Sequence, residues 1–375
     1  MSKVAVFVAR YGIGNSPSII NFLDLLSDHY QVDLYVRDVG MLDAPVLGKD
    51  SINVIPIRRR HVLAYWAKNS IIHSSAYEHF ICFNPNAFVM CKEMFPRSRP
   101  IYYCLELHMS YDHKGLHYPP DVSRKERAWI NDIQGLIIQS EAREKLFRED
   151  YKLSDEVPTF YLPVTYSGEP CADKSDCLRK KYGIALDKNI LIQLGEIKWW
   201  FNCIDIARSV AGLDDWVLFI HGYYDWEYLE ELKRVLRDEQ IDNVIVSHDF
   251  IASIDDLNEM IKSCDVGVAW YSDYTINMKT VGTSSGKISA YLKFGLPVIT
   301  NSYPTLVSAV EDRGCGSCLD DFVDIPSALS RISDNYESYS KNAIDEYERT
   351  YRFSNYEETL LEFIESKDKV ACGVR

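Results

Sequence analysis

Long apolar runs are absent from this sequence. No stretch approaches the ~20 consecutive apolar residues that a membrane-spanning helix requires. A secretory leader is absent as well, because Met1, Ser2 and Lys3 run directly into the strand-like segment VAVFVA. We therefore expect a cytoplasmic protein that at most contacts the inner face of a membrane.

Positive charge is scarce: 41 Lys and Arg residues stand against 55 Asp and Glu residues, and the formal net charge is −14. Non-specific nucleic-acid binding needs a basic footprint, so we expect no nucleic-acid partner. One exception is Arg58-Arg59-Arg60, which precedes the aromatic segment VLAYWAKNSII. Cations beside Trp and Tyr are typical of peripheral contact with anionic lipid. The alternative, which we favour slightly, is a core helix or strand behind a solvated basic loop.

Metal-binding patterns are also lacking. Ten cysteines are scattered through the chain, and only Cys315 and Cys318 have metal-like spacing. No second pair or nearby His completes a zinc site, and no Asp-x-Asp motif occurs in a suitable loop after a strand. We therefore expect no metal and no bound cofactor.

The sequence does contain a regular alternation of β-rich runs and amphipathic segments. The predicted strands of the first half are 4–9, 32–36, 52–57, 80–83, 101–107, 135–140 and 159–164. Continuous apolar runs are typical of parallel strands that are covered on both faces. The alternation predicts a Rossmann-like domain over residues 1–170.

A polar segment, 171–187, is predicted to connect this domain to a second one. The alternation then restarts with strands 189–194, 217–220, 244–247 and 265–271, and with helices 204–211, 226–238 and 254–263. This predicts a second Rossmann-like domain over 186–330. Residues 331–375 are predicted to form a helical tail that crosses back to the first domain. The fold class is therefore α/β, with two doubly wound domains facing a cleft.

The first predicted strand ends in a glycine turn. Gly12 and Gly14 form the turn, Asn15 follows, and Pro17 suits the first helical position. The dinucleotide fingerprint needs a third glycine and an acidic residue later than Asp33, so this turn is not that motif. We expect a loop on the acceptor side, although a tight turn without further function fits equally well.

The stretch GTSSGKISAYLKFGLPVIT follows a predicted strand late in the chain. Ser284, Ser285 and Gly286 are small residues at a predicted helix start, and Lys287 adds a cation. Free N–H groups, the positive end of the helix dipole and an ammonium together favour an anion, so this segment predicts a phosphate site. The alternative is that the serines only cap their own helix.

The second half also carries an ordered series of motifs: LIQLGEIK, VLFIHG, NVIVSHDFI and SSGKISAYLKFGLPVITNS. With the tail YESYSKNAIDEYERTYRFSNYEETLLEFI, this series resembles the retaining group-1 glycosyltransferases of GT-B architecture. The first half resembles that family in layout only. The resemblance implies a nucleotide-sugar donor that is bound by the second domain.

The resemblance also implies site residues. Those at the donor are Gly195, Lys198, Gly222, Asp249, Phe250, Ser284, Ser285, Gly286 and Lys287. As catalytic residues it implies Lys287 at the diphosphate and His108, after the run 101–107, facing the sugar. His113 and His117 compete with His108 for this role, and Glu106 is its plausible neighbour.

The sequence departs from the family at three places. A pair of glutamates eight positions apart is the family's hallmark, and here Gly282 and Ala290 occupy those positions. The usual arginine after the first glycine is Glu196. The ribose-binding and catalytic roles of those residues therefore do not carry over.

We expect a glycosyltransferase that moves a sugar from a nucleotide-sugar donor to a glycan or lipid-linked acceptor, with retention and without a metal. Charge develops on the diphosphate leaving group, so fixed N–H groups and cations would stabilise it. One alternative is a catalytically silent nucleotide-sugar-binding or partner protein, which the missing glutamates favour. Another is a nucleotide-sugar epimerase of GT-B fold.

Overall fold

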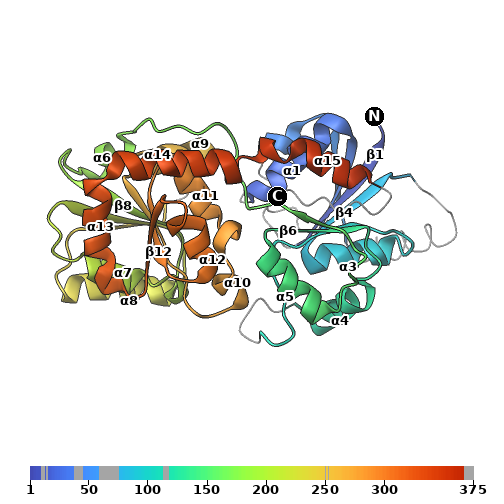
Figure 1. Ribbon diagram of the computed structural model, residues 1–375, viewed down its shortest axis with the longest axis horizontal. Helices are drawn as coiled ribbons and strands as arrows, with labels where there is room; N and C mark the ends of the chain where they lie inside the picture. The colour runs from blue at the N-terminus through green and yellow to red at the C-terminus, as the bar shows by residue number, and fades with distance from the viewer. Residues whose placement is uncertain are drawn as a thin grey trace. The chain divides into compact units, whose positions relative to one another are not determined.

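The computed structural model describes residues 1–9, 13, 16–37, 45–58, 76–112, 118–249, 251 and 253–366. The chain divides into two compact units, each built on one parallel sheet (Figure 1). Unit 1 comprises Met1–Ser167 together with Phe353–Arg375, and unit 2 comprises Gly168–Arg352. The two sheets arise from the two α/β repeats of the sequence, which confirms the predicted fold class of two Rossmann-like domains.

Unit 1 contains a seven-stranded sheet in the order β3-β2-β1-β4-β5-β6-β7, in which all neighbours are parallel. Its strands are β1 (Lys3–Val8), β2 (Gln31–Val36), β3 (Ile52–Pro56), β4 (His79–Phe83), β5 (Ile101–Tyr103), β6 (Gly135–Ile138) and β7 (Thr159–Tyr161). The apolar runs of the central strands are continuous because helices cover both faces of the sheet.

The helices of unit 1 divide between the two faces of its sheet. They are α1 (Pro17–His29) and α15 (Glu357–Glu365) on one face, and α3 (Asn84–Met94), α4 (Pro120–Trp129) and α5 (Glu141–Tyr151) on the other (Figure 1). Short 3-10 turns are η3 (Pro45–Gly48) and η9 (Phe353–Asn355). The tail helix α15 buries Leu360 and Phe363 in this core, and a Cβ at Gly135 would lie only 2.6 Å from the Phe363 ring. The close packing therefore requires a glycine at the start of β6.

Unit 2 contains a six-stranded sheet in the order β10-β9-β8-β11-β12-β13. Its strands are β8 (Asn189–Ile197), β9 (Trp216–Tyr224), β10 (Val244–Ser247), β11 (Val266–Ala269), β12 (Val298–Asn301) and β13 (Gly316–Leu319). All neighbouring strands are again parallel.

The helices of unit 2 also lie on both faces. The α-helices are α6 (Cys177–Tyr182), α7 (Cys203–Val210), α8 (Trp226–Asp238), α9 (Ile254–Lys262), α10 (Ile276–Lys279), α11 (Gly286–Lys293), α12 (Pro304–Leu306), α13 (Ile325–Asp334) and α14 (Tyr336–Glu346). Short 3-10 or π turns are η4 (Trp199–Phe201), η5 (Gly282–Ser284), η6 (Val307–Glu311), η7 (Phe322–Asp324) and η8 (Tyr347–Tyr351). Helices α7, α8 and α13 pack on one face of the sheet. Helix α11 lies on the other face, where Tyr291 occupies the space beside Gly267.

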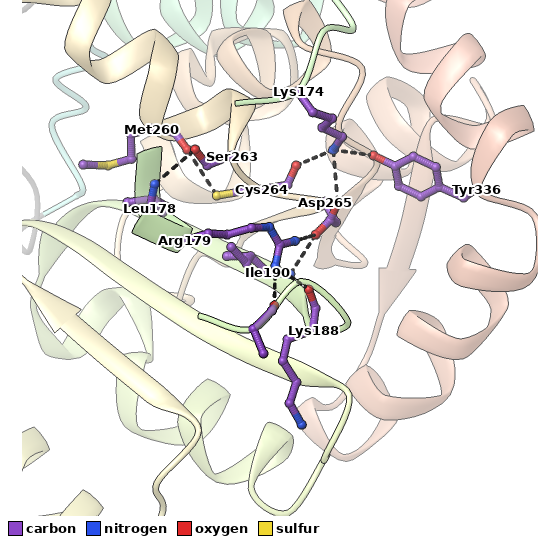
Figure 2. Close-up of polar contacts among 11 residues, drawn as sticks. Lys174, Leu178, Arg179, Lys188, Ile190, Met260, Ser263, Cys264, Asp265 and Tyr336 are labelled. Atoms are coloured by element: carbon purple, nitrogen blue, oxygen red, sulfur yellow. Dashed lines mark hydrogen bonds and ion pairs between the residues drawn. The ribbon is translucent and has the colours of Figure 1, made fainter. Parts of the chain in front are cut away.

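The polar segment 171–187 lies within unit 2 and is tied to the amino end of its sheet (Figure 2). The Asp265 carboxylate accepts hydrogen bonds from Lys174 Nζ (3.2 Å) and from the backbone N–H of Ile190 (2.8 Å). Arg179 forms an ion pair with the same carboxylate at 3.5 Å, and Lys174 also donates to the Tyr336 hydroxyl at 2.9 Å. These bonds brace the starts of β8 and β11 and leave the carboxyl ends of the strands free.

The secondary structure departs from the sequence prediction at several strand ends and at one whole strand. The strand predicted over 101–107 ends at Tyr103; the Cys104 N–H still bonds to the Ile137 carbonyl of β6, but the N–H groups of Leu105 and Glu106 bond to the Asn84 side chain instead. Strand β13 was not predicted, because it consists largely of small residues; Cys315 and Cys318, beside and within it, are free cysteines. Within the residues described, no helix combines the length and apolar character needed to cross a membrane.

Candidate functional site

The strand order of unit 2 reverses between β8 and β11. At such a switch point the following connections leave toward opposite faces, and ligands bind beyond the carboxyl ends of the strands. Gly195 lies near the carboxyl end of β8, and Lys287 lies in the first turn of α11, the eight-residue helix that follows β11 and its loop. The predicted donor residues therefore come from both sides of the switch point.

Two glycines predicted to bind the donor are paired near the carboxyl ends of β8 and β9. Gly195 pairs with Gly222 in the ladder, and a Cβ at Gly222 would lie 1.4 Å from the Gly195 carbonyl oxygen. Gly195 itself has φ +120, and a Cβ there would lie 3.4 Å from Lys287 Nζ. The structure thus brings Gly195, Gly222 and Lys287 together. Because the two glycines have no side chains, their backbone is open to close approach by a ligand.

The start of α11 is capped as its sequence predicts. The Ser285 hydroxyl accepts a hydrogen bond from the Ile288 N–H at 3.1 Å, so Ser285 is the N-cap. The Tyr271 hydroxyl is also hydrogen-bonded to Ser285 Oγ, at 2.5 Å. Ser284 donates to the Val281 carbonyl within its own turn. The serine hydroxyls thus have structural roles, and the anion-binding capacity of this turn rests on its backbone N–H groups, which include those of Gly286 and Lys287.

The Lys287 ammonium lies over aromatic rings. Its Nζ is 3.5 Å from the centre of the Phe201 ring and 4.9 Å from that of Tyr271. Burial of the ammonium lowers the pKa of Lys287 to about 7, against the opposing effects of Cys203 and Glu196. Among the residues with described positions, no hydrogen bond or ion pair to Nζ is found. The Lys287 amine therefore lies at the switch point with no anion from the described part of the chain bound to it.

The nearest acidic residue is already paired. Glu196 Oε1 lies 2.9 Å from Lys198 Nζ, and Lys198 also lies 4.8 Å from the centre of the Trp200 ring. Lys198, a predicted diphosphate contact, is thus neutralised by the residue that replaces the family's arginine. Lys287 remains the stronger candidate for binding an anion.

Asp249 lies at the other edge of the sheet, after β10. Its carboxylate accepts a hydrogen bond from Lys181 Nζ at 2.8 Å and one from the Tyr182 hydroxyl at 3.4 Å. The bond from Lys181 holds the pKa of Asp249 below its usual range. The structure thus places the Asp249 side chain against α6 and not beside Lys287. The predicted partner, Phe250, lies outside the described residues.

In unit 1, the loop after β5 is held by buried polar side chains. Asn84 Oδ1 accepts hydrogen bonds from the N–H groups of Leu105 (2.8 Å) and Glu106 (3.2 Å), and Arg143 donates to the Leu105 carbonyl at 3.0 Å. Burial raises the pKa of the Glu106 carboxyl, and the nearby Arg143 guanidinium opposes the shift. This framework fixes the backbone that leads to His108.

The backbone of His108 is held in place through hydrogen bonds to its carbonyl oxygen. That oxygen accepts hydrogen bonds from the Tyr151 hydroxyl (3.0 Å) and from Arg127 Nη2 (3.1 Å). The single proton of the Tyr151 hydroxyl is shared between this carbonyl and Glu126 Oε2, which also lies 3.0 Å away, and burial raises the pKa of Glu126 to about 7. The position of the His108 backbone is thus determined by several side chains, while its role toward a sugar stays a prediction.

Several predicted residues lie outside the described part of the chain. These are Gly12, Gly14 and Asn15 of the acceptor-side loop, Arg59 and Arg60 of the basic segment, and the competing His113 and His117. Arg58 is described and is exposed after β3. The sequence analysis did not identify Phe201 and Tyr271 as site residues. The only feature of the sequence that could have indicated them is that each follows the carboxyl end of a strand.

One known protein family matches a segment that lies mostly in unit 2. Residues 222–362, less than half of the 375-residue chain, match the family described as Glucosyltransferase 3-like, C-terminal domain. A search of curated proteins found no match.

Solved structures resemble nearly the whole chain. The Anabaena protein Alr3699/HepE, solved with UDP and glucose, is 14% identical with a TM-score of 0.72, over 98% of this chain and 100% of its own. WaaG, a glycosyltransferase involved in lipopolysaccharide biosynthesis, is 16% identical with a TM-score of 0.66, over 96% and 99%. A sucrose-phosphate synthase from Thermosynechococcus elongatus is 13% identical with a TM-score of 0.71, over 96% and 98%. The chain therefore has the two-domain GT-B fold of these proteins, and its residues 222–362 are similar to a Glucosyltransferase 3-like, C-terminal domain.

Proposed function

We propose that this protein is a glycosyltransferase that moves a sugar from a nucleotide-sugar donor to a glycan or glycolipid acceptor. The observation that carries the proposal is the ammonium of Lys287, which has no anionic partner among the described residues and lies beside the paired Gly195 and Gly222. A diphosphate fits this position, because it would meet bare backbone, the first turn of α11 and a cation together.

In such a transfer the bond between the anomeric carbon and the diphosphate oxygen breaks. The acceptor oxygen bonds to that carbon, and the proton of the acceptor hydroxyl passes to an oxygen of the departing diphosphate. Negative charge grows on the leaving diphosphate, so groups fixed around it stabilise the transition state more than the ground state. Lys287 would donate to a phosphate oxygen, and the N–H groups at the start of α11 would bind another. Retention of configuration and independence of a metal belong to the proposal.

The nature of the donor and acceptor is supported by the structural neighbours. HepE was solved with UDP and glucose and also with UDP-glucose, and WaaG is involved in lipopolysaccharide biosynthesis. We therefore propose a uridine diphosphate sugar as the first donor to test and a lipid-linked glycan as the acceptor class. Peripheral attachment to the inner face of a membrane, through Arg58 and its two neighbours, would bring the enzyme to such an acceptor.

The experiment compares transfer and donor hydrolysis in the wild type and in Lys287→Ala, with and without a chelator. Removing one donor to a developing oxyanion lowers turnover by roughly 100-fold or more, so we expect at least that loss in the variant. Lys341, an exposed lysine on α14, provides the matched control, and Lys341→Ala should keep full activity. Wild-type turnover in Lys287→Ala would rule out the phosphate site, and loss of activity in the chelator would rule out metal independence.

A catalytically silent protein on the same fold is the second candidate. The position of the family's first glutamate is occupied by Gly282, where a Cβ would lie 2.8 Å from the Thr305 carbonyl oxygen. A longer side chain would not fit there without a shift of the backbone, so the local structure is adapted to the loss of that carboxylate. Nucleotide binding without any turnover or hydrolysis, across donors and acceptors, would favour this candidate.

A further inference from the structure

A cavity of about 320 Å³ opens at the carboxyl ends of β11, β12 and β13. It lies entirely within unit 2, and its walls come from the loops that follow these three strands and from Asn202 after η4. Ligand pockets span about 300–1,000 Å³, so this cavity is of a size for one small molecule and not for an oligosaccharide.

The lining combines aromatic rings with neutral polar groups and carboxylates. The rings of Trp270 and Phe322 pack 4.3 Å apart, and Tyr303 adds a half-buried phenol. The charged side chains of the lining are Asp273, which forms an ion pair with Lys279 at 2.6 Å, and Asp320. The Asp320 carboxylate disfavours an anion and, together with the rings, suits a neutral polyol, whose hydroxyls can donate to a carboxylate while its carbon skeleton packs on rings.

The walls of the cavity are fixed before any ligand binds. The Asn301 side chain accepts from the Tyr271 N–H at 3.1 Å and donates to the Tyr271 carbonyl at 3.0 Å. The Ser272 hydroxyl lies 2.7 Å from the Trp200 carbonyl oxygen and 2.8 Å from Asn202 Oδ1, and its single proton is shared between these two acceptors. Groups held in this way lose little freedom on binding, which is the usual basis of a preorganised site.

Tyr271 joins this cavity to the phosphate site. Tyr271 is one of the residues that line the cavity, while its ring lies 4.9 Å from Lys287 Nζ and its hydroxyl bonds to the N-cap of α11. A diphosphate at Lys287 and a group in the cavity would therefore be separated by a single residue. In a nucleotide-sugar the sugar is bonded directly to the diphosphate, so neighbouring sites for the two groups suit such a molecule.

We propose that this cavity binds the glycosyl group of the donor, with Asp320 and Tyr303 as residues that recognise its hydroxyls. Asp320 already accepts a hydrogen bond from Ser302 on one oxygen, which leaves the other to accept from a sugar. The inference rests on the proposed function, because it takes the diphosphate site as its starting point. It assigns neutral hexoses, and not uronic acids, as the sugar class that this protein transfers.

The test is saturation-transfer NMR on UDP-glucose bound to the intact protein, in the wild type, Asp320→Asn, Tyr303→Phe and the control Asp334→Asn, an exposed residue on α13. The ratio of saturation on glucosyl protons to that on uridine protons reports contact with the sugar. Loss of one hydrogen bond to a charged group is worth about tenfold in occupancy, so we expect this ratio to fall at least about threefold in Asp320→Asn. It should fall less in Tyr303→Phe and stay unchanged in Asp334→Asn.

The possible results separate the two proposals. Saturation of uridine protons with an unchanged glucosyl ratio in both cavity variants would overturn the cavity assignment alone. Absence of saturation on uridine in the wild type would overturn the uridine diphosphate donor of the proposed function, and this inference with it. Asp320 and Tyr303 are exposed and half-buried, so melting temperatures close to that of the wild type would show that both variants fold.

Discussion

Lys287 has an environment that is unusual for a lysine. Its ammonium rests on two aromatic rings, which provide cation–π attraction but no counter-charge. Such an arrangement is costly for the free protein, because burial favours the uncharged amine. A bound diphosphate would supply the missing negative charge and favour the ammonium.

This predicts a pH dependence of donor binding. Free Lys287, with its pKa lowered to about 7, is largely uncharged at higher pH, whereas the bound diphosphate requires the ammonium. Binding above pH 7 therefore takes up a proton, and affinity falls as pH rises. We expect the Kd of UDP-glucose, measured by calorimetry, to increase by up to about tenfold per pH unit above pH 7.5 and to be nearly constant below pH 6.5.

Two variants serve as controls for this prediction. Lys287→Ala should bind weakly and without this pH dependence, while Lys341→Ala should reproduce the wild-type curve. UDP-glucose is the better ligand here, because its diphosphate has no terminal phosphate that ionises near neutral pH. A wild-type affinity that is constant from about pH 6.5 to 8.5 would contradict the assigned role of Lys287.

At the scale of elements, the pairing of β8 with β9 depends on glycine. A Cβ at Gly222 would collide with the Gly195 carbonyl, which is backbone and cannot move aside as a side chain would. We expect Gly222→Ala to lower the free energy of unfolding by about 3 kcal/mol or more and to weaken UDP binding, since the strands must separate. Gly48→Ala, where a Cβ would meet nothing within 4 Å, should change stability by less than about 0.5 kcal/mol. Urea denaturation of both variants measures the difference, and equal stabilities would contradict the prediction.

The loop after β5 gives a second prediction at this scale. Asn84 is fully buried with φ +63, and its side chain satisfies two backbone N–H groups of the loop. Asn84→Ala leaves both N–H groups unpaired and puts alanine in a left-handed conformation, so we expect a loss of about 2–4 kcal/mol in the free energy of unfolding.

Asn86, two residues further along α3, is the matched control for this variant. It is also buried, but its amide nitrogen has no hydrogen-bond partner among the described residues. Asn86→Ala should therefore cost much less, and it could stabilise the protein. If the two variants were destabilised equally in urea, the loop would not depend on the Asn84 bonds.

At the scale of the whole chain, the sequence predicted the architecture better than the site. The central strands were predictable because parallel strands covered on both faces leave continuous apolar runs, and α8 and β10 match their predicted bounds. Strand β13 was missed because small residues there give no such run. Contacts between side chains could not be predicted from the sequence. Tyr271, for example, bonds to Ser285 across 14 residues only because the sheet brings β11 and α11 together.

The candidate site shows the same limit. The resemblance to the glycosyltransferase family implied Gly195, Gly222 and Lys287 as residues of one donor site, and the structure places these three residues close together. The sequence did not predict that Glu196 would pair with Lys198, or that Asp249 would pair with α6. These pairings depend on the relative positions of side chains, which only the folded sheet determines.

The measurement that tests the central claim most directly is a thermal-shift titration of UDP and UDP-glucose against the wild type and Lys287→Ala. A ligand that binds only the native state stabilises it by about 2.7 kcal/mol at 100 times its Kd, which corresponds to a shift of several degrees. We predict such a shift for the wild type and for Lys341→Ala, and little or none for Lys287→Ala at the same concentration. Equal shifts in the wild type and Lys287→Ala would contradict the claim that this ammonium binds the diphosphate of the donor.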